Sequence, residues 1–197
     1  MSLASVRHLH PASYRRMAWK NGGGITTELV RSPADAENYD WRVSIADIAQ
    51  DGDFSIFPGI DRQLMLLEGG GIELVIGTDE PTRLEQRFRK VAFPGEAPVN
   101  CYLLDGPTRD FNVMCRRGAV DAELLARTIV GPMLLFPAAD TTWLLYVVNG
   151  HVQVKAPAVA AEAGDTLIVT FNDATQPVVL NGAGELVLVR FKPTPPA

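Results

Sequence analysis

Leu66-Leu67-Glu68-Gly69-Gly70-Gly71-Ile72-Glu73-Leu74 is an apolar run, a cluster of glycines and a second, alternating run. Val147-Val148-Asn149-Gly150-His151-Val152-Gln153-Val154 follows the same order in the second half of the chain. Short apolar or alternating runs on either side of glycine are typical of β-strands joined by a tight turn. The sequence therefore predicts a β-protein in which each half contains one such strand-turn-strand unit.

The elements downstream of the two units also correspond. Lys90-Val91-Ala92-Phe93-Pro94-Gly95 leads to Pro98-Val99, and Gly164-Asp165-Thr166-Leu167-Ile168-Val169 leads to Pro177-Val178. This weak internal repeat indicates that the two halves share an architecture.

Strand-like runs continue from end to end, and only residues 121–127, with Asp121 as a cap, suggest a helix. We expect an all-β fold of two jelly-roll-type β-barrel sandwiches packed together. The first would comprise residues 1–120 and the second residues 121–197, and strand exchange between the halves is compatible with this division.

The overall composition excludes several classes of protein. Of 197 residues, 47% are hydrophobic and 21% are charged, which is typical of a globular chain. A net charge of -5 argues against nucleic acid or an anionic membrane as the partner. No signal peptide or membrane span is expected, so we expect a cytoplasmic protein. Cys101 and Cys115 lack metal-ligand spacing, and we expect two reduced, buried thiols.

Two alternating runs each place polar side chains on one face of a strand. In Trp41–Ala46, Arg42 and Ser44 share a face. The second run contributes a longer set, namely Asp110, Asn112, Met114 and Arg116. If these faces point into the mouth of a barrel they form a ligand pocket, whereas pointing outward they are ordinary solvated surfaces.

Trp19-Lys20-Asn21-Gly22-Gly23-Gly24 places a cation, an amide and an aromatic ring directly before three glycines. Such a glycine run marks backbone in unusual conformations or in close contact with other groups. The segment is either a tight loop between two strands or a ligand-binding loop.

Leu145-Tyr146-Val147-Val148-Asn149-Gly150, followed by Ala163-Gly164-Asp165-Thr166-Leu167-Ile168-Val169, resembles the β-barrel of the cupin superfamily. Many cupins bind a metal through histidine and glutamate. Here Arg62, Pro58 and Ile56 stand at those positions in the first half, and Trp143 stands at the glutamate position in the second. None of these residues is a suitable ligand, so we expect no metal and no other cofactor.

More specifically, the chain resembles the HutD/Ves family of bicupin-like bacterial proteins over nearly its whole length. The matching segments are Trp19–Gly24 with Thr27-Glu28, Trp41–Ala46, Asp51–Arg62 and Asp110–Met114. The resemblance implies a role in bacterial histidine utilisation, through binding of urocanate or a related intermediate and regulation of the pathway.

A guanidinium group recognises a carboxylate well, and Arg62 would replace the metal as the fixed positive charge of the pocket. The alternative for Arg62 is a turn arginine paired with Asp61 or Asp53. The expected ligand site comprises Trp19, Lys20, Asn21, Arg42, Ser44, Phe54, Arg62, Asn112, Met114 and Arg116.

Three functions compete. The leading hypothesis is a metal-independent protein that binds a small carboxylated metabolite and regulates histidine utilisation. The second is a hydrolase or isomerase of the same fold, with Glu28 or Asp110 as acid or base. The third is a structural role in which the second barrel forms a homodimer.

Overall fold

The computed structural model describes residues 4–34, 38–171 and 176–194, and it is all-β apart from a 3-10 turn at Pro11–Ser13. The chain forms two compact units. One is Tyr14–Ala119, and the other combines Met1–Ser13 with Val120–Ala197. The described residues up to Ser13 therefore group with the second half of the chain, whereas the predicted first domain, residues 1–120, included them.

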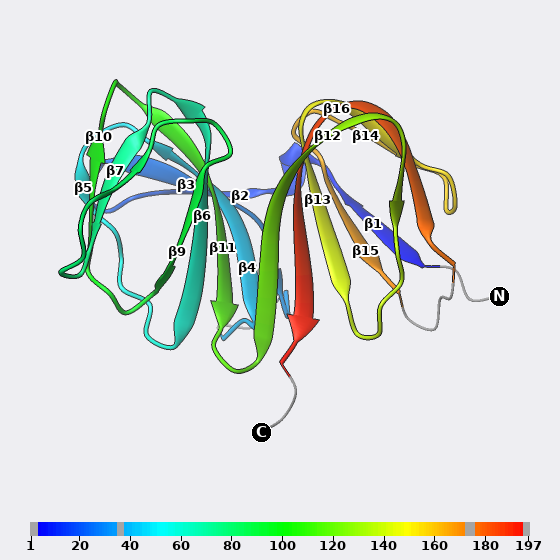
Figure 1. Cartoon of the computed structure of the whole chain (residues 1–197), viewed down its shortest axis with the longest axis horizontal. Coiled ribbons are helices and arrows are strands. Elements are labelled where there is room, and N and C mark those ends of the chain that lie inside the picture. Colours follow the sequence, from blue (N-terminus) through cyan, green and yellow to red (C-terminus); the bar gives the residue numbers. More distant parts are fainter. Residues whose placement is uncertain (1–3, 35–37, 172–175, 195–197) are drawn as a thin grey trace. The chain divides into compact units, whose positions relative to one another are not determined.

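The Tyr14–Ala119 unit contains two antiparallel sheets (Figure 1). The larger has six strands in the order β2 (Arg15–Ala18), β3 (Gly24–Ser32), β4 (Trp41–Ile48), β11 (Thr108–Arg116), β6 (Ile60–Gly69) and β9 (Lys90–Pro94). The smaller has four strands in the order β5 (Gly52–Asp53), β10 (Val99–Leu103), β7 (Ile72–Ile76) and β8 (Thr82–Leu84).

Apolar side chains from both sheets share one core. Ile48, Leu64 and Leu66 come from the larger sheet, and Leu74 and Cys101 come from the smaller. Because successive side chains of a strand point to opposite faces, these residues define the inner face of each sheet. The described strands of this unit form a two-layer sandwich, and no closed barrel is formed.

The Gly69-Gly70-Gly71 segment does not form the predicted hairpin turn. β6 ends at Gly69 and pairs with β11 and β9, whereas β7 begins at Ile72 and pairs with β10 and β8. The glycines therefore carry the chain from one sheet to the other. Apolar runs on both sides of a glycine cluster are compatible with a hairpin and with a change of sheet, since each run is buried in either case.

The second unit is a six-stranded sheet in the order β1 (Ser5–Leu9), β15 (Thr166–Thr170), β13 (Thr142–Val154), β16 (Val178–Pro193) and β12 (Val120–Leu135), with β14 (Val159–Glu162) also paired to β13. Figure 1 shows the blue β1 beside the orange β15, and their register runs from Ser5 opposite Thr170 to Leu9 opposite Thr166. Its core includes Leu145, Leu167 and Leu188.

The second predicted strand-turn-strand unit is one long, bent strand. β13 continues through Asn149 and Gly150, with a register shift against β16 between Val147 and Asn149. Gly150 has a φ of 73°, and a Cβ atom there would clash with the backbone carbonyl of Ala183. A bulge with glycine in the left-handed region bends a strand without ending it, which explains the turn-like sequence.

Residues 121–127 belong to β12 and not to a helix. This strand pairs with β16 along its whole length, from Val120 opposite Pro193 to Leu135 opposite Val178. Asp121 and Glu123 are exposed, whereas Leu124 is fully buried. Pairing with β16 therefore overrides the weak helical signal. Within the described residues, no helix has the length and apolar character needed to cross a membrane.

Candidate functional site

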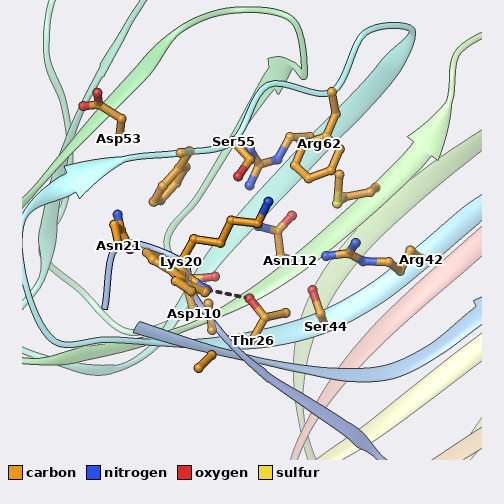
Figure 2. A pocket seen from close by; sticks show the side chains of 16 residues that line it. Lys20, Asn21, Thr26, Arg42, Ser44, Asp53, Ser55, Arg62, Asp110 and Asn112 are labelled. Carbon is orange, nitrogen blue, oxygen red and sulfur yellow. Dashed lines mark hydrogen bonds between the residues drawn. The ribbon is translucent and has the colours of Figure 1, made fainter. Parts of the chain in front are cut away.

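A pocket with a volume of about 490 Å³ opens over the inner face of the six-stranded sheet in the Tyr14–Ala119 unit (Figure 2). Its lining comes from the end of β2 and the loop that follows it, from strands β3, β4, β6 and β11, and from β5 and the segment after it. The lining residues are Ala18, Trp19, Lys20, Asn21, Thr26, Arg42, Ser44, Ala46, Asp53, Phe54, Ser55, Phe57, Arg62, Asp110, Asn112 and Met114.

The structure brings nine of the ten predicted site residues to this pocket: Trp19, Lys20, Asn21, Arg42, Ser44, Phe54, Arg62, Asn112 and Met114. Arg116 is the exception. Its side chain is 48% exposed at the end of β11 and forms an ion pair with Asp40. The alternating pattern fixes which face a residue occupies but does not fix where along the strand the pocket ends.

Strand register arranges the floor of the pocket in rows. One row pairs Arg42 and Arg62 with Met114 between them. The next row pairs Ser44 with Asn112. The third pairs Ala46 with Asp110. Basic groups therefore occupy one end of the floor, amide and hydroxyl groups the middle, and a carboxyl group the other end.

Arg62 is a buried cation set among aromatic rings. Its guanidinium carbon lies 5.3 Å, 5.7 Å and 4.8 Å from the ring centroids of Phe54, Phe57 and Phe93. The residue is 6% exposed, and no residue in the described part of the chain gives its Nε a hydrogen-bond partner. Burial lowers the pKa of Arg62 to about 10, so the group remains protonated at neutral pH. It is not the turn arginine of the alternative hypothesis, since Asp61 instead pairs with Arg117.

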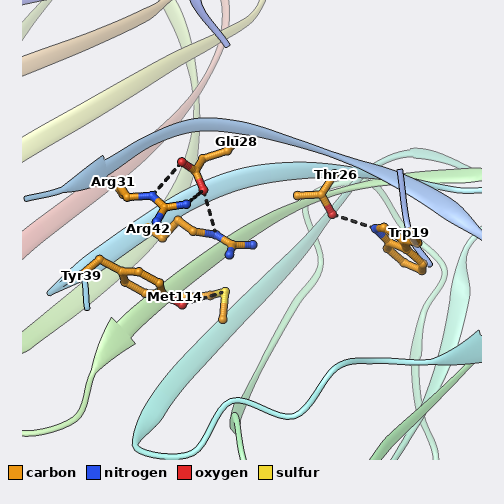
Figure 3. A network of polar contacts seen from close by, with 7 residues as sticks. All are labelled: Trp19, Thr26, Glu28, Arg31, Tyr39, Arg42 and Met114. Carbon is orange, nitrogen blue, oxygen red and sulfur yellow. Dashed lines mark hydrogen bonds and ion pairs between the residues drawn. The ribbon is translucent and has the colours of Figure 1, made fainter. Parts of the chain in front are cut away.

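Arg42 is partly neutralised, unlike Arg62. Glu28 accepts hydrogen bonds from Arg31 Nε at 2.8 Å and Arg31 Nη2 at 2.5 Å, and its Oε2 lies 3.6 Å from Arg42 Nε (Figure 3). Both guanidinium groups also lie near the Tyr39 ring, at 5.7 Å and 5.8 Å from its centroid. Glu28 is thus engaged in a network that positions Arg42, and it does not line the pocket.

Asp110 is the most unusual group of the floor. The residue is 0% exposed, and neither carboxylate oxygen has a hydrogen-bond partner among the described residues. Burial raises the pKa of Asp110 to about 7, against the lowering effect of Arg62. Sequence reasoning placed Asp110 on the correct strand face but omitted it from the ligand site. The available signal was its position in the alternating pattern, two residues before Asn112 and on the same face of the strand.

The Trp19–Gly24 segment is a tight loop that also contributes to the pocket. It closes through hydrogen bonds from Trp19 N to Gly24 O at 2.9 Å and from Gly22 N to Trp19 O at 3.0 Å. Trp19 Nε1 donates to Thr26 Oγ1 at 2.8 Å, which fixes the indole ring. A Cβ atom at Gly24 would lie 2.6 Å from Asp47 O, so packing against the next strand requires glycine there. The two interpretations of this segment are therefore compatible.

The lining does not suit a cupin-type metal. It contains three cations, namely Lys20, Arg42 and Arg62, with two carboxylates, Asp53 and Asp110. Within the described residues, no group of three or more histidine, cysteine, aspartate or glutamate side chains is placed to hold a metal ion. A guanidinium group at the cupin ligand position would repel a divalent cation.

Comparison with known proteins places this geometry in a family. The HutD family model matches residues 11–188. A Pseudomonas putida protein, described as an uncharacterized 21.2 kDa protein in the hutC 3' region, is 37% identical over 78% of this chain and 79% of its own length. Protein Ves of Citrobacter koseri is 38% identical over 74% of each chain.

The solved structures agree. HutD from Pseudomonas fluorescens SBW25, in its formate condition, superposes with a TM-score of 0.81 at 31% identity and covers 96% of this chain and 99% of that one. Other structures at 11% identity, with TM-scores of 0.69 and 0.66, share the cupin-like fold alone. The chain belongs to the HutD family.

Proposed function

We propose that this protein binds urocanate or a related carboxylated intermediate without a metal, and that binding regulates histidine utilisation. The carboxylate lies against Arg62 and beside Arg42, and Lys20 extends toward the same space from the loop between β2 and β3 (Figure 2). Asn21, Ser44 and Asn112 orient the rest of the molecule.

The observation that carries this proposal is the state of Arg62. The guanidinium is 6% exposed and lines the pocket, and within residues 4–34, 38–171 and 176–194 its Nε lacks a hydrogen-bond partner. A buried charge without an ion-pair partner is costly, and a carboxylate ligand supplies both the opposite charge and two acceptor oxygens. Figure 2 shows Lys20, Arg42 and Arg62 extending toward the same space, where their positive charges attract an anion.

The remaining walls suit a planar, unsaturated ligand. Trp19 and Phe54 meet edge to face with their ring centroids 6.2 Å apart. Since Thr26 already accepts the indole N–H, the Trp19 ring offers mainly its apolar surface. The family context supports an intermediate of histidine breakdown, because the Pseudomonas putida relative is described by its position in the hutC region.

Calorimetric titration with urocanate, formylated glutamate and histidine tests the proposal. Arg62→Met should weaken binding by about tenfold to a hundredfold, because it removes a charge-assisted hydrogen bond worth about 1.5–3 kcal/mol. Arg116→Met is the matched control, since Arg116 is exposed and paired with Asp40. This variant should bind the ligand with the affinity of the wild-type protein. No binding of any of the three compounds by folded wild-type protein would refute the proposal.

An enzyme acting on the same metabolite is the second candidate. The specific observation in its favour is the pKa of about 7 for Asp110, which suits proton transfer near neutral pH. Glu28 is a poorer candidate because two arginines engage it. Incubating the protein with excess urocanate and following its ultraviolet absorbance would reveal turnover, which simple binding does not produce.

The cytoplasm is the proposed location, since the intermediates of a catabolic pathway are found there.

A homodimer is a further proposal. Val130, Leu134 and Phe136 are exposed apolar residues of the second unit, and mass measurements over a range of concentrations test whether it self-associates.

A further inference from the structure

Recognition of a carboxylate by Arg62 leaves the opposite end of the pocket unexplained. Asp110 is fully buried, lines the pocket and has no hydrogen-bond partner for either oxygen among the described residues. Asn112 Oδ1, on the same strand face, also lacks a partner. A buried acceptor that is left unpaired costs about 1–3 kcal/mol. A ligand that donates hydrogen bonds to these three oxygens would remove this cost.

The arrangement is bipolar along β11. Asp110 lies four residues from Met114, the cross-strand partner of Arg62. At about 3.4 Å per residue, the two rows are about 14 Å apart along the strand at their Cα atoms. The long side chain of Arg62 shortens the gap between the functional groups, and Asn112 lies between the two rows.

We propose that Asp110 is a second recognition point, which accepts a hydrogen bond from an N–H group at the end of the ligand opposite its carboxylate. This inference rests on the proposed function and deepens it. The ligand class becomes a small molecule with a carboxylate at one end and a nitrogen heterocycle or ammonium group at the other, and Asn112 Oδ1 is available for a donor between them.

The surroundings of Asp110 favour an aromatic heterocycle. Thr26 lies on β3 opposite Ala46, and Ala46 lies on β4 opposite Asp110. Thr26 holds the indole of Trp19, so a flat apolar ring stands next to the acidic end of the pocket. A planar ring can contact the indole while its N–H reaches the carboxylate.

A ligand pair that differs only at the N–H isolates this contact. Urocanate is compared with 3-(oxazol-4-yl)acrylate, in which a ring oxygen replaces the N–H while the second ring nitrogen and the acrylate carboxylate are retained. Both compounds are titrated into wild-type protein, Asp110→Leu and Asp110→Asn. The leucine variant continues the apolar row formed by Ala46 and Leu66, the cross-strand partners of Asp110, and the asparagine variant keeps the shape of the side chain.

Wild-type protein should bind urocanate about tenfold to a hundredfold more tightly than oxazolylacrylate, the range expected for a charge-assisted hydrogen bond. In Asp110→Leu this preference should fall to nearly onefold through loss of urocanate affinity, with oxazolylacrylate affinity unchanged. Asp110→Asn should lie between the two. The four affinities of the wild-type and leucine proteins form a double-mutant cycle in which the ligand N–H is one of the two changes.

Equal binding of the two compounds by wild-type protein would overturn the role of Asp110, as would a preference that survives in Asp110→Leu. The carboxylate site would stand in either case, provided that Arg62→Met weakens binding of both compounds. Failure of both compounds to bind wild-type protein would overturn the inference, and the proposed function would fall with it only if formylated glutamate and histidine also fail to bind.

Discussion

Replacing Asp110 by asparagine should make the stability of the ligand-free protein less dependent on pH. Burial raises the pKa of Asp110 from 3.8 to about 7, against the effect of Arg62 on β6. Asp47 on β4 acts in the same direction as burial. Between these pKa values the folded protein holds a proton that the unfolded chain has released. The free energy of unfolding therefore falls, on account of this group, as the pH rises from 3.8 to about 7.

The size of the effect follows from the two pKa values. The interval from 3.8 to about 7 corresponds to about 4 kcal/mol, at about 1.4 kcal/mol per pH unit. About 1.7 kcal/mol of this cost is present at about pH 5, and nearly all of it is present at about pH 8. The free energy of unfolding of Asp110→Asn, relative to that of wild type, should therefore rise by about 2.5 kcal/mol from about pH 5 to about pH 8. Any hydrogen-bond cost of the uncharged amide is the same at both and cancels.

Urea denaturation of both proteins at the two pH values measures this gain. Asp79→Asn is the matched control, because Asp79 is an exposed residue of the same unit and its replacement also converts one carboxylate into an amide. The reasoning is refuted if the stability difference between Asp110→Asn and wild type is independent of pH. It is equally refuted if the Asp79 variant shows the same trend.

Two further predictions concern the network beside the pocket and the bend in β13. Glu28→Gln should lower the free energy of unfolding by about 1–3 kcal/mol, since it leaves Arg31 and Arg42 close together without their shared carboxylate. Thermal denaturation in low salt measures this loss. Gly150→Ala should destabilise the protein by more than about 2 kcal/mol or prevent folding, because its φ is 73° and the added Cβ atom meets the backbone of Ala183. An unchanged thermal midpoint for Glu28→Gln, or an unchanged urea midpoint for Gly150→Ala, would contradict the corresponding explanation.

The strand faces of the first unit were predictable from sequence because local alternation determines them. Trp41–Ala46 and Asp110–Met114 lie on neighbouring strands, and the residues expected on their polar faces meet in register, as with Ser44 opposite Asn112. A period of two survives any tertiary arrangement, so the side of the sheet is readable without knowing the partner strand. The position of Arg116 beyond the pocket depends on where the covering loops end, which alternation does not encode.

Connections between strands were predicted less well, for a related reason. Glycine clusters indicate unusual backbone but do not distinguish a hairpin, a change of sheet and a bulge. Gly69-Gly70-Gly71 changes sheets, and Gly150 bends a continuous strand. Each outcome is set by pairing partners far away in sequence, such as β16 for β13. The internal repeat in the sequence therefore reflects similar burial patterns and not similar turns.

The omission of Asp110 from the expected site shows a different limit. A search for groups that bind a carboxylate selects cations and rejects an acid, yet the floor of this pocket carries both. Only the structure shows that Asp110 is buried, with no hydrogen-bond partner in the part of the chain that is described, while Arg62, similarly buried, stands two rows away. In an ordinary core such groups would be replaced by apolar residues, because their burial lowers stability. The proposed ligand, with complementary ends, would pair both groups, and its binding to the folded state should raise stability by an amount set by its affinity and concentration.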